Sequence, residues 1–188
     1  MSDPLIIKAI SIGLGLMFLA AAWHKLSGAA QFRITLLEYQ VLPDALVGLT
    51  SRIVPVFEIL LGAAWLAGYY GQGITAIGSA LLLGIYALAI GINIARGRVH
   101  FDCGCGFGGK GENEQYLSGK LIVRNLVLIA AALYTLVPAA PRELGFADYL
   151  VLAAALLAGG LLFGAANQLI ANRAAIDTWR KRSRSNGR

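Results

Sequence analysis

The sequence predicts an all-α membrane protein, built as a polytopic bundle of about five transmembrane helices. The chain has 188 residues, of which 57% are hydrophobic and only 14% are charged, and its mean hydropathy is +0.67. Soluble domains are usually about 45–50% apolar and about 25% charged. This chain therefore has too little polar surface to coat a water-soluble globule, and its apolar residues fall in runs of spanning length.

Five apolar runs, each of roughly 17–25 residues, are long enough to cross about 30 Å of hydrocarbon as a helix. They are rich in Gly and Ala, as membrane helices tolerate. We expect residues 1–172 to form the bundle, as a four-helix core plus one further helix, and residues 173–188 to form a basic tail. The expected spans are Pro4–Trp23, Ile53–Tyr70, Gln72–Ala95, Leu121–Val137 and Phe146–Ile170.

Between the first two runs, the spacing of apolar residues predicts a short amphipathic helix that ends at Pro43. Such a helix either lies in the membrane interface or caps the end of the bundle. Its apolar residues are Phe32, Leu36, Leu37, Tyr39, Val41 and Leu42.

The formal charge of +6 does not indicate nucleic-acid binding, because the charged residues lie between and after the long apolar runs and the sequence has no nucleic-acid motif. With five spans, every Lys and Arg except Lys8 and Arg142 falls on one side of the membrane. The positive-inside rule makes that side cytoplasmic. We therefore expect a multi-pass protein of the bacterial inner membrane, surrounded by lipid, with its C-terminus and third connection in the cytoplasm. The basic tail could also bind anionic headgroups.

The third connection holds the only two cysteines of the chain, in the motif Cys103-Gly104-Cys105. Two cysteines separated by one Gly can close a small disulfide ring, since Gly admits backbone angles that other residues resist. A ring this tight is strained and easily reduced, which suits exchange rather than structural stapling. Nearby basic residues would lower a thiol pKa and Asp102 would oppose this. Two free thiols in a tight turn are the structural alternative.

A metal site is the rival chemistry for this motif. His24 ends the first span and His100 precedes the cysteines, and these are the only histidines. Together with Cys103 and Cys105 they could form a Cys2His2 site for zinc or copper. The spacing matches no standard zinc finger, so we expect no cofactor.

Four polar residues lie inside the apolar runs, near the membrane face that carries the cysteines. They are Glu58, Asn93, Arg124 and Asn125. Ionisable side chains inside a bilayer usually face the bundle interior and form pairs. We expect Glu58 and Arg124 to pair, in a structural or a functional role. Their position near one face argues against a transporter, which would favour a midplane site.

Several of these residues occur in an order that resembles the MauE family, the integral-membrane component of methylamine utilisation, which is similar to the wider DoxX-like membrane proteins. The resemblance covers roughly residues 10–135, and its most specific part is the Cys-Gly-Cys motif followed by Arg-Asn. The family usually reads Cys-Gly-Cys-Phe-Gly, whereas here Gly106 intervenes before Phe107-Gly108. The matching residues are His24-Lys25-Leu26, Phe32, Tyr39, Leu42-Pro43, Glu58-Ile59-Leu60-Leu61-Gly62, Cys103-Gly104-Cys105 and Arg124-Asn125.

The resemblance implies that the four-helix core is DoxX-like and that the protein helps to mature a disulfide-rich periplasmic partner. Cys103 and Cys105 would exchange redox equivalents, which would make the protein a thiol–disulfide oxidoreductase or an electron conduit. Glu58 and Arg124, with Asn93 and Asn125, would form the polar core. Supporting roles would fall to His24, Lys25, His100 and Asp102. The alternative is a non-catalytic accessory subunit of a larger membrane redox complex.

Overall fold

The computed structural model describes residues 2–68, 73–97 and 119–185, which form six helices and no strand. This confirms the all-α prediction. Cys103, Cys105, His100 and Asp102 lie outside the described residues. The helices are α1 (Pro4–Ser27), α2 (Ala29–Tyr39), α3 (Asp44–Leu66), α4 (Ile74–Ala95), α5 (Gly119–Tyr134) and α6 (Phe146–Ser185).

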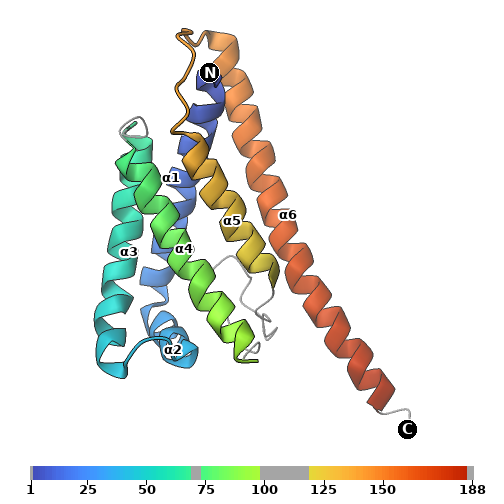
Figure 1. Ribbon diagram of the computed structural model, residues 1–188. Coiled ribbons are helices and arrows are strands. Elements are labelled where there is room, and N and C mark those ends of the chain that lie inside the picture. Colours follow the sequence, from blue (N-terminus) through green and yellow to red (C-terminus); the bar gives the residue numbers. More distant parts are fainter. Residues whose placement is uncertain (1, 69–72, 98–118, 186–188) are drawn as a thin grey trace.

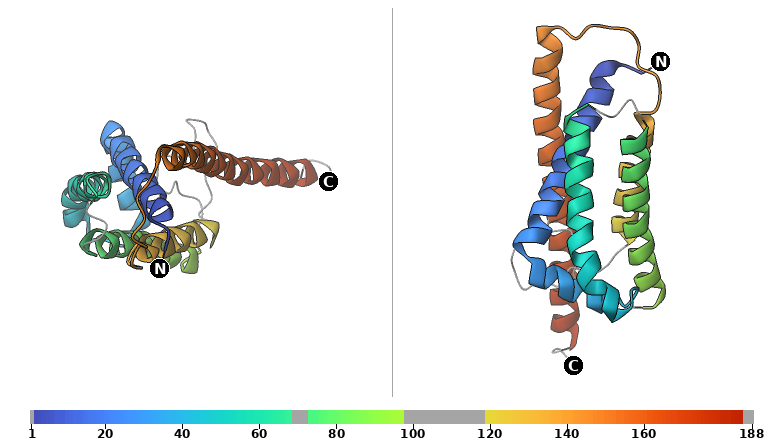
Figure 2. Two further views of the ribbon diagram at one scale, coloured as in Figure 1. Left: turned by 90° about the horizontal axis from the view of Figure 1, so that it is seen from above. Right: turned by 90° about the vertical axis from the view of Figure 1, so that its left-hand side faces the viewer.

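Four of the helices, α1, α3, α4 and α5, run alongside one another as an up-and-down bundle (Figure 1). The short α2 lies across one end of this bundle, which we call the α2 end. Helices α1 and α4 finish there, and α3 and α5 begin there. Helix α6 starts beside the N-terminus at the opposite end and leaves the bundle at an angle, so that its C-terminus points beyond the α2 end (Figure 2).

Four helices, α1, α3, α4 and the first 21 residues of α6, are long and apolar enough to cross a membrane. The fourth expected span, Leu121–Val137, is shorter than predicted, because α5 ends at Tyr134. There the hydroxyl of Thr135 donates to the carbonyl of Ala132 at 2.7 Å. Pro138, which lacks a backbone donor, follows shortly afterwards.

The second span begins earlier than predicted, at Asp44 rather than Ile53. Pro43 precedes the first turn and Asp44 lies within it, where a carboxylate interacts favourably with the helix dipole. One consequence is that Pro55 lies inside α3 and not in its first turns. Membrane helices tolerate an internal Pro where neighbouring groups satisfy the backbone.

The predicted amphipathic helix is α2, and it caps the bundle with one face. Phe32, Thr35 and Tyr39 are buried on that face at helical spacing. The helix ends at Tyr39, before Pro43, and Gln40 then adopts a left-handed conformation with φ of 45°. The carbonyl of Gln40 accepts a hydrogen bond of 3.0 Å from Arg96, just beyond α4.

At the opposite end, an exposed ion-pair network joins the N-terminus to the start of α6. Arg142 binds Asp3 at 3.0 Å and also binds Asp148. Hydrogen bonding and charge from Asp148, together with the charge of Asp3, raise the pKa of Arg142 above its ordinary value. Helix α6 then continues unbroken past residue 172, the expected boundary between bundle and tail.

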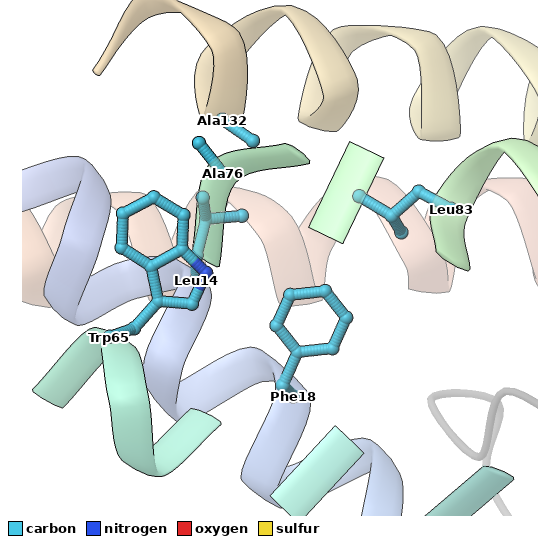
Figure 3. Close-up of a cluster of buried hydrophobic side chains, with 6 residues drawn as sticks. All are labelled: Leu14, Phe18, Trp65, Ala76, Leu83 and Ala132. Carbon is cyan, nitrogen blue, oxygen red and sulfur yellow. The ribbon is translucent and has the colours of Figure 1, made fainter. Parts of the chain in front are cut away.

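The interior of the bundle near this opposite end is apolar, and we call it the dry cluster (Figure 3). Within it, the indole Nε1 of Trp65 donates to the hydroxyl of Ser79 at 2.9 Å, so the largest buried side chain leaves no donor unpaired. The cluster consists of Leu14, Phe18, Trp65, Ala76, Leu83 and Ala132.

Helices α1 and α3 pack closely because two glycines meet where they cross. A Cβ atom added at Gly62 would lie 2.8 Å from Leu19 Cγ and 3.0 Å from the carbonyl oxygen of Gly15. A Cβ at Gly15 would lie 3.2 Å from the carbonyl of Gly62. Small residues at a crossing let two membrane helices approach backbone to backbone.

Replacing Gly62 with Ala should therefore destabilise the bundle by about 1–3 kcal/mol, the usual cost of overpacking. Thermal unfolding in detergent would measure the loss. Gly48→Ala on the same helix is the matched control, since a Cβ there meets nothing within 4 Å. Equal melting temperatures for the two variants would contradict the close crossing.

Candidate functional site

A buried ion pair joins α1 to α3. Lys25 Nζ lies 2.6 Å from Glu58 Oε1, and the two side chains are only 4% and 1% exposed. The hydroxyl of Tyr86, on α4, donates to the same oxygen at 2.8 Å. One carboxylate oxygen therefore holds together three helices of the bundle.

Aromatic rings complete the surroundings of the lysine. Lys25 Nζ lies 5.3 Å from the ring centroid of Tyr86 and 5.6 Å from that of Phe32, on α2. An ammonium group within about 6 Å of a ring face is attracted by the ring quadrupole. Lys25 is thus stabilised by one carboxylate and two rings, which explains how an ammonium group can be almost completely buried.

Helical periodicity brings these residues together. Lys25 follows Phe18 by seven residues on the buried stripe of α1, and Glu58 precedes Gly62 by four on that of α3. Residues three to four apart lie on the same face of a helix. Tyr86 lies between Leu83 and Ile90 on the inner face of α4.

Asn125 lies at the same level in the bundle. It is 2% exposed and lies on the α5 face that also carries Leu121, one turn before it, and Leu128, about one turn after it. Leu128 packs against the dry cluster, whereas Leu121 packs with Tyr39 and Ile90 in a second apolar cluster. We call the group between the two clusters the polar layer, and it consists of Lys25, Glu58, Tyr86 and Asn125.

The other two predicted core residues lie beside this layer. Asn93 is fully buried and follows Ile90 by one turn towards the α2 end of α4, where its amide donates to the carbonyl of Ala89 at 3.0 Å. Arg124 is half-buried on α5, next to Asn125. Asn93, Arg124 and Asn125 thus lie in the halves of α4 and α5 nearer the α2 end, whereas Glu58 lies near the middle of α3.

The predicted pairing of Glu58 with Arg124 is wrong. Glu58 pairs with Lys25, and among the described residues the guanidinium Nε of Arg124 has no hydrogen-bond partner. The reason is that α3 packs mainly on α1 rather than on α5. The positions of Glu58 and Arg124 within their expected spans did not reveal which helices are neighbours.

The sequence prediction also left out Tyr86 and Phe32 as contacts of the buried pair, and gave Lys25 only a supporting role. The spacing from Phe18 to Lys25 could have shown that Lys25 belongs to the buried stripe of α1. His24, one residue earlier, is exposed and outside the layer. No group of three or more potential metal ligands occurs within residues 2–68, 73–97 and 119–185.

The neighbouring Trp23 is 74% exposed on the outside of α1. Tryptophan is enriched where membrane helices reach the headgroup level. Trp23 therefore indicates that the end of α1 lies near one membrane face, whereas Glu58 and Tyr86 lie near the middle of α3 and α4. The sequence prediction that Glu58 lies close to one face is wrong, because α3 begins nine residues earlier than expected.

Comparisons with known proteins show the family of this chain. The family model described as methylamine utilisation protein MauE matches residues 3–138, which covers α1 to α5 and all of the polar layer. The chain belongs to the MauE family. No solved structure matches it.

Three curated MauE proteins illustrate the similarity. The methylamine utilization protein MauE of Paracoccus versutus is 36% identical over 87% of this chain and 84% of its own length. The MauE of Paracoccus denitrificans is 35% identical over 70% of this chain and 68% of its own length. The MauE of Methylorubrum extorquens strain AM1 is 29% identical over 88% of both chains.

We predict a strong coupling between Lys25 and Glu58 in a double-mutant cycle. Lys25→Met or Glu58→Gln alone leaves a buried partner without its counterpart and should cost about 3–5 kcal/mol. The double variant should cost less than the sum of the two, as measured by unfolding in detergent. Arg124→Met combined with Glu58→Gln is the control and should be additive. Coupling to Arg124 instead of Lys25 would contradict the structure.

Proposed function

We propose that this MauE-family protein exchanges thiol–disulfide redox equivalents through Cys103 and Cys105 during the maturation of a partner protein. The observation that carries the proposal is that the chain has only two cysteines and that a single Gly separates them. Their segment follows α4 and precedes α5, two helices that pack against each other.

The exchange conserves both electrons and disulfides. One thiolate of the pair attacks a disulfide of the partner, so that the partner's S–S bond breaks and a mixed disulfide forms. The second thiolate then attacks the mixed disulfide and releases the partner as a dithiol. Two electrons pass to the partner and the Cys103–Cys105 disulfide forms; the reverse sequence oxidises the partner.

We also propose a location in the bacterial inner membrane, with the α2 end facing the cytoplasm. The support is the position of the basic residues, since the first connection, the flanks of the third connection and the end of α6 lie towards the α2 end. The positive-inside rule places such an end in the cytoplasm. With that orientation, electrons exchanged at the motif have to cross the bundle to reach a periplasmic partner.

One observation favours the alternative, a non-catalytic accessory subunit of a larger membrane redox complex. The apolar part of α6 is only 6% buried, compared with 22–33% in the other three candidate spans. Helix α6 thus contributes little to the described bundle and offers a long apolar surface to lipid or to another membrane subunit.

Labelling of the cysteines should show both their side and their redox state. A membrane-impermeant maleimide should label Cys103 and Cys105 in inverted vesicles but not in intact cells. If the two cysteines have formed a disulfide, labelling should require prior reduction. A variant with a single cysteine introduced at exposed Phe146, on the opposite end and combined with Cys103→Ser and Cys105→Ser, should give the reverse pattern. Labelling of the native pair in intact cells would overturn the orientation.

A trapping experiment separates exchange from the accessory role. Changing only the resolving cysteine to Ser, as Cys103→Ser or Cys105→Ser, should leave a mixed disulfide with a partner that reducing agent releases. The double Cys-to-Ser variant should trap nothing yet retain any assembly that depends on the bundle. If neither single variant traps a partner while the double variant loses assembly of a larger complex, the accessory role is correct.

A further inference from the structure

Four buried polar atoms in and beside the polar layer have no hydrogen-bond partner among the described residues. They are Glu58 Oε2, Asn93 Oδ1, Arg124 Nε and Asn125 Nδ2. Three of these atoms belong to side chains that are at most 2% exposed. A buried polar atom without a partner costs about 1–3 kcal/mol, and more when the group is charged. Such a concentration points to a ligand that satisfies them.

The register of α4 and α5 brings two of these atoms to the same level. Glu58 Oε1 contacts the Tyr86 hydroxyl, so the free Oε2 lies at the level of Tyr86 between the dry cluster and the second apolar cluster. Asn125 occupies the corresponding position on α5. An oxygen that only accepts and an amide that can donate therefore share one layer of the bundle interior.

Charge and packing limit what this ligand can be. Lys25 and Glu58 form a pair without net charge, so the layer has no excess charge that would attract an ion. The layer is closed on one side by the dry cluster and on the other by Tyr39, Ile90 and Leu121. The ligand must then be small, uncharged, and able both to donate and to accept hydrogen bonds.

We propose that the polar layer binds internal water, which donates to Glu58 Oε2 and accepts from the Asn125 amide. Buried water typically makes about three hydrogen bonds to polar groups that otherwise lack partners. Water here hydrates the free side of the carboxylate whose other oxygen already accepts from Lys25 and Tyr86. The inference does not depend on any reaction of the cysteines.

Helix α2 covers this water site. Phe32 is 8% exposed and its ring faces Lys25, while Tyr39 on the same face packs in the second apolar cluster. Water beneath such a cover should exchange with bulk solvent more slowly than water on the outer surface of the protein.

X-ray radiolytic labelling of the full chain in detergent tests the proposal, because hydroxyl radicals formed from bound water oxidise the side chains next to it. Phe32 and Phe18 are a matched pair, since both are buried phenylalanines but only Phe32 borders the polar layer. Phe32 should be oxidised several-fold faster than Phe18. After mixing with ¹⁸O-water, the heavy label should appear at Phe32 later than at exposed Phe146.

Variants distinguish internal water from bulk water that reaches Phe32 from outside. Asn125→Leu removes one proposed water ligand from a helix that does not carry Phe32, and should lower Phe32 oxidation several-fold. Ser79→Ala, which removes the hydroxyl that accepts from Trp65 of the dry cluster, should leave Phe32 oxidation unchanged. Equal oxidation of Phe32 and Phe18 in the unmodified protein would overturn the proposal, as would immediate ¹⁸O uptake at Phe32. These two readouts need no variant to fold.

Discussion

The burial of one ammonium group and one carboxylate in an otherwise apolar bundle constrains much of this structure. Removing two ions from water is costly, and their attraction compensates only when the pair is close and further hydrogen bonds satisfy it. Lys25 and Glu58 meet these conditions only if α1 and α3 keep one register. The glycine crossing of Gly15 and Gly62, about three turns along α1 from Lys25, provides the close approach that the short pair requires.

The pair also explains why α4 and α2 place a tyrosine and a phenylalanine next to it. Tyr86 donates to the carboxylate, and Phe32 presents a ring to the ammonium, so each helix that surrounds the pair supplies a group suited to one of the charges. Apolar clusters then close the layer on both sides. A polar layer between apolar layers favours a single alignment of the helices, because a shift by one turn would bring charges against leucines and isoleucines.

Much of this arrangement could be predicted from the sequence, and the errors have physical causes. Run lengths identified an all-α membrane protein, and the amphipathic pattern identified the helix α2 but left open whether it lies in the membrane interface or caps the bundle. Burial of Glu58, Asn93 and Asn125 followed from the cost of facing lipid. The partner of Glu58 did not follow, because depth along a helix says nothing about which helices are neighbours. The start of α3 was missed because hydropathy detects the apolar part of a helix and not its polar first turns.

Helix α6 is a single element that runs from the apolar span into the basic tail. Its backbone is helical from Phe146 to Ser185, and residues Phe146–Ala166 are apolar enough to cross a membrane. At about 1.5 Å per residue, the positions of Arg180 to Arg184 lie roughly 20–27 Å beyond Ala166 along the helix axis. Because the helix is continuous, the backbone and not a flexible linker sets the distance between the apolar span and residues 180–184.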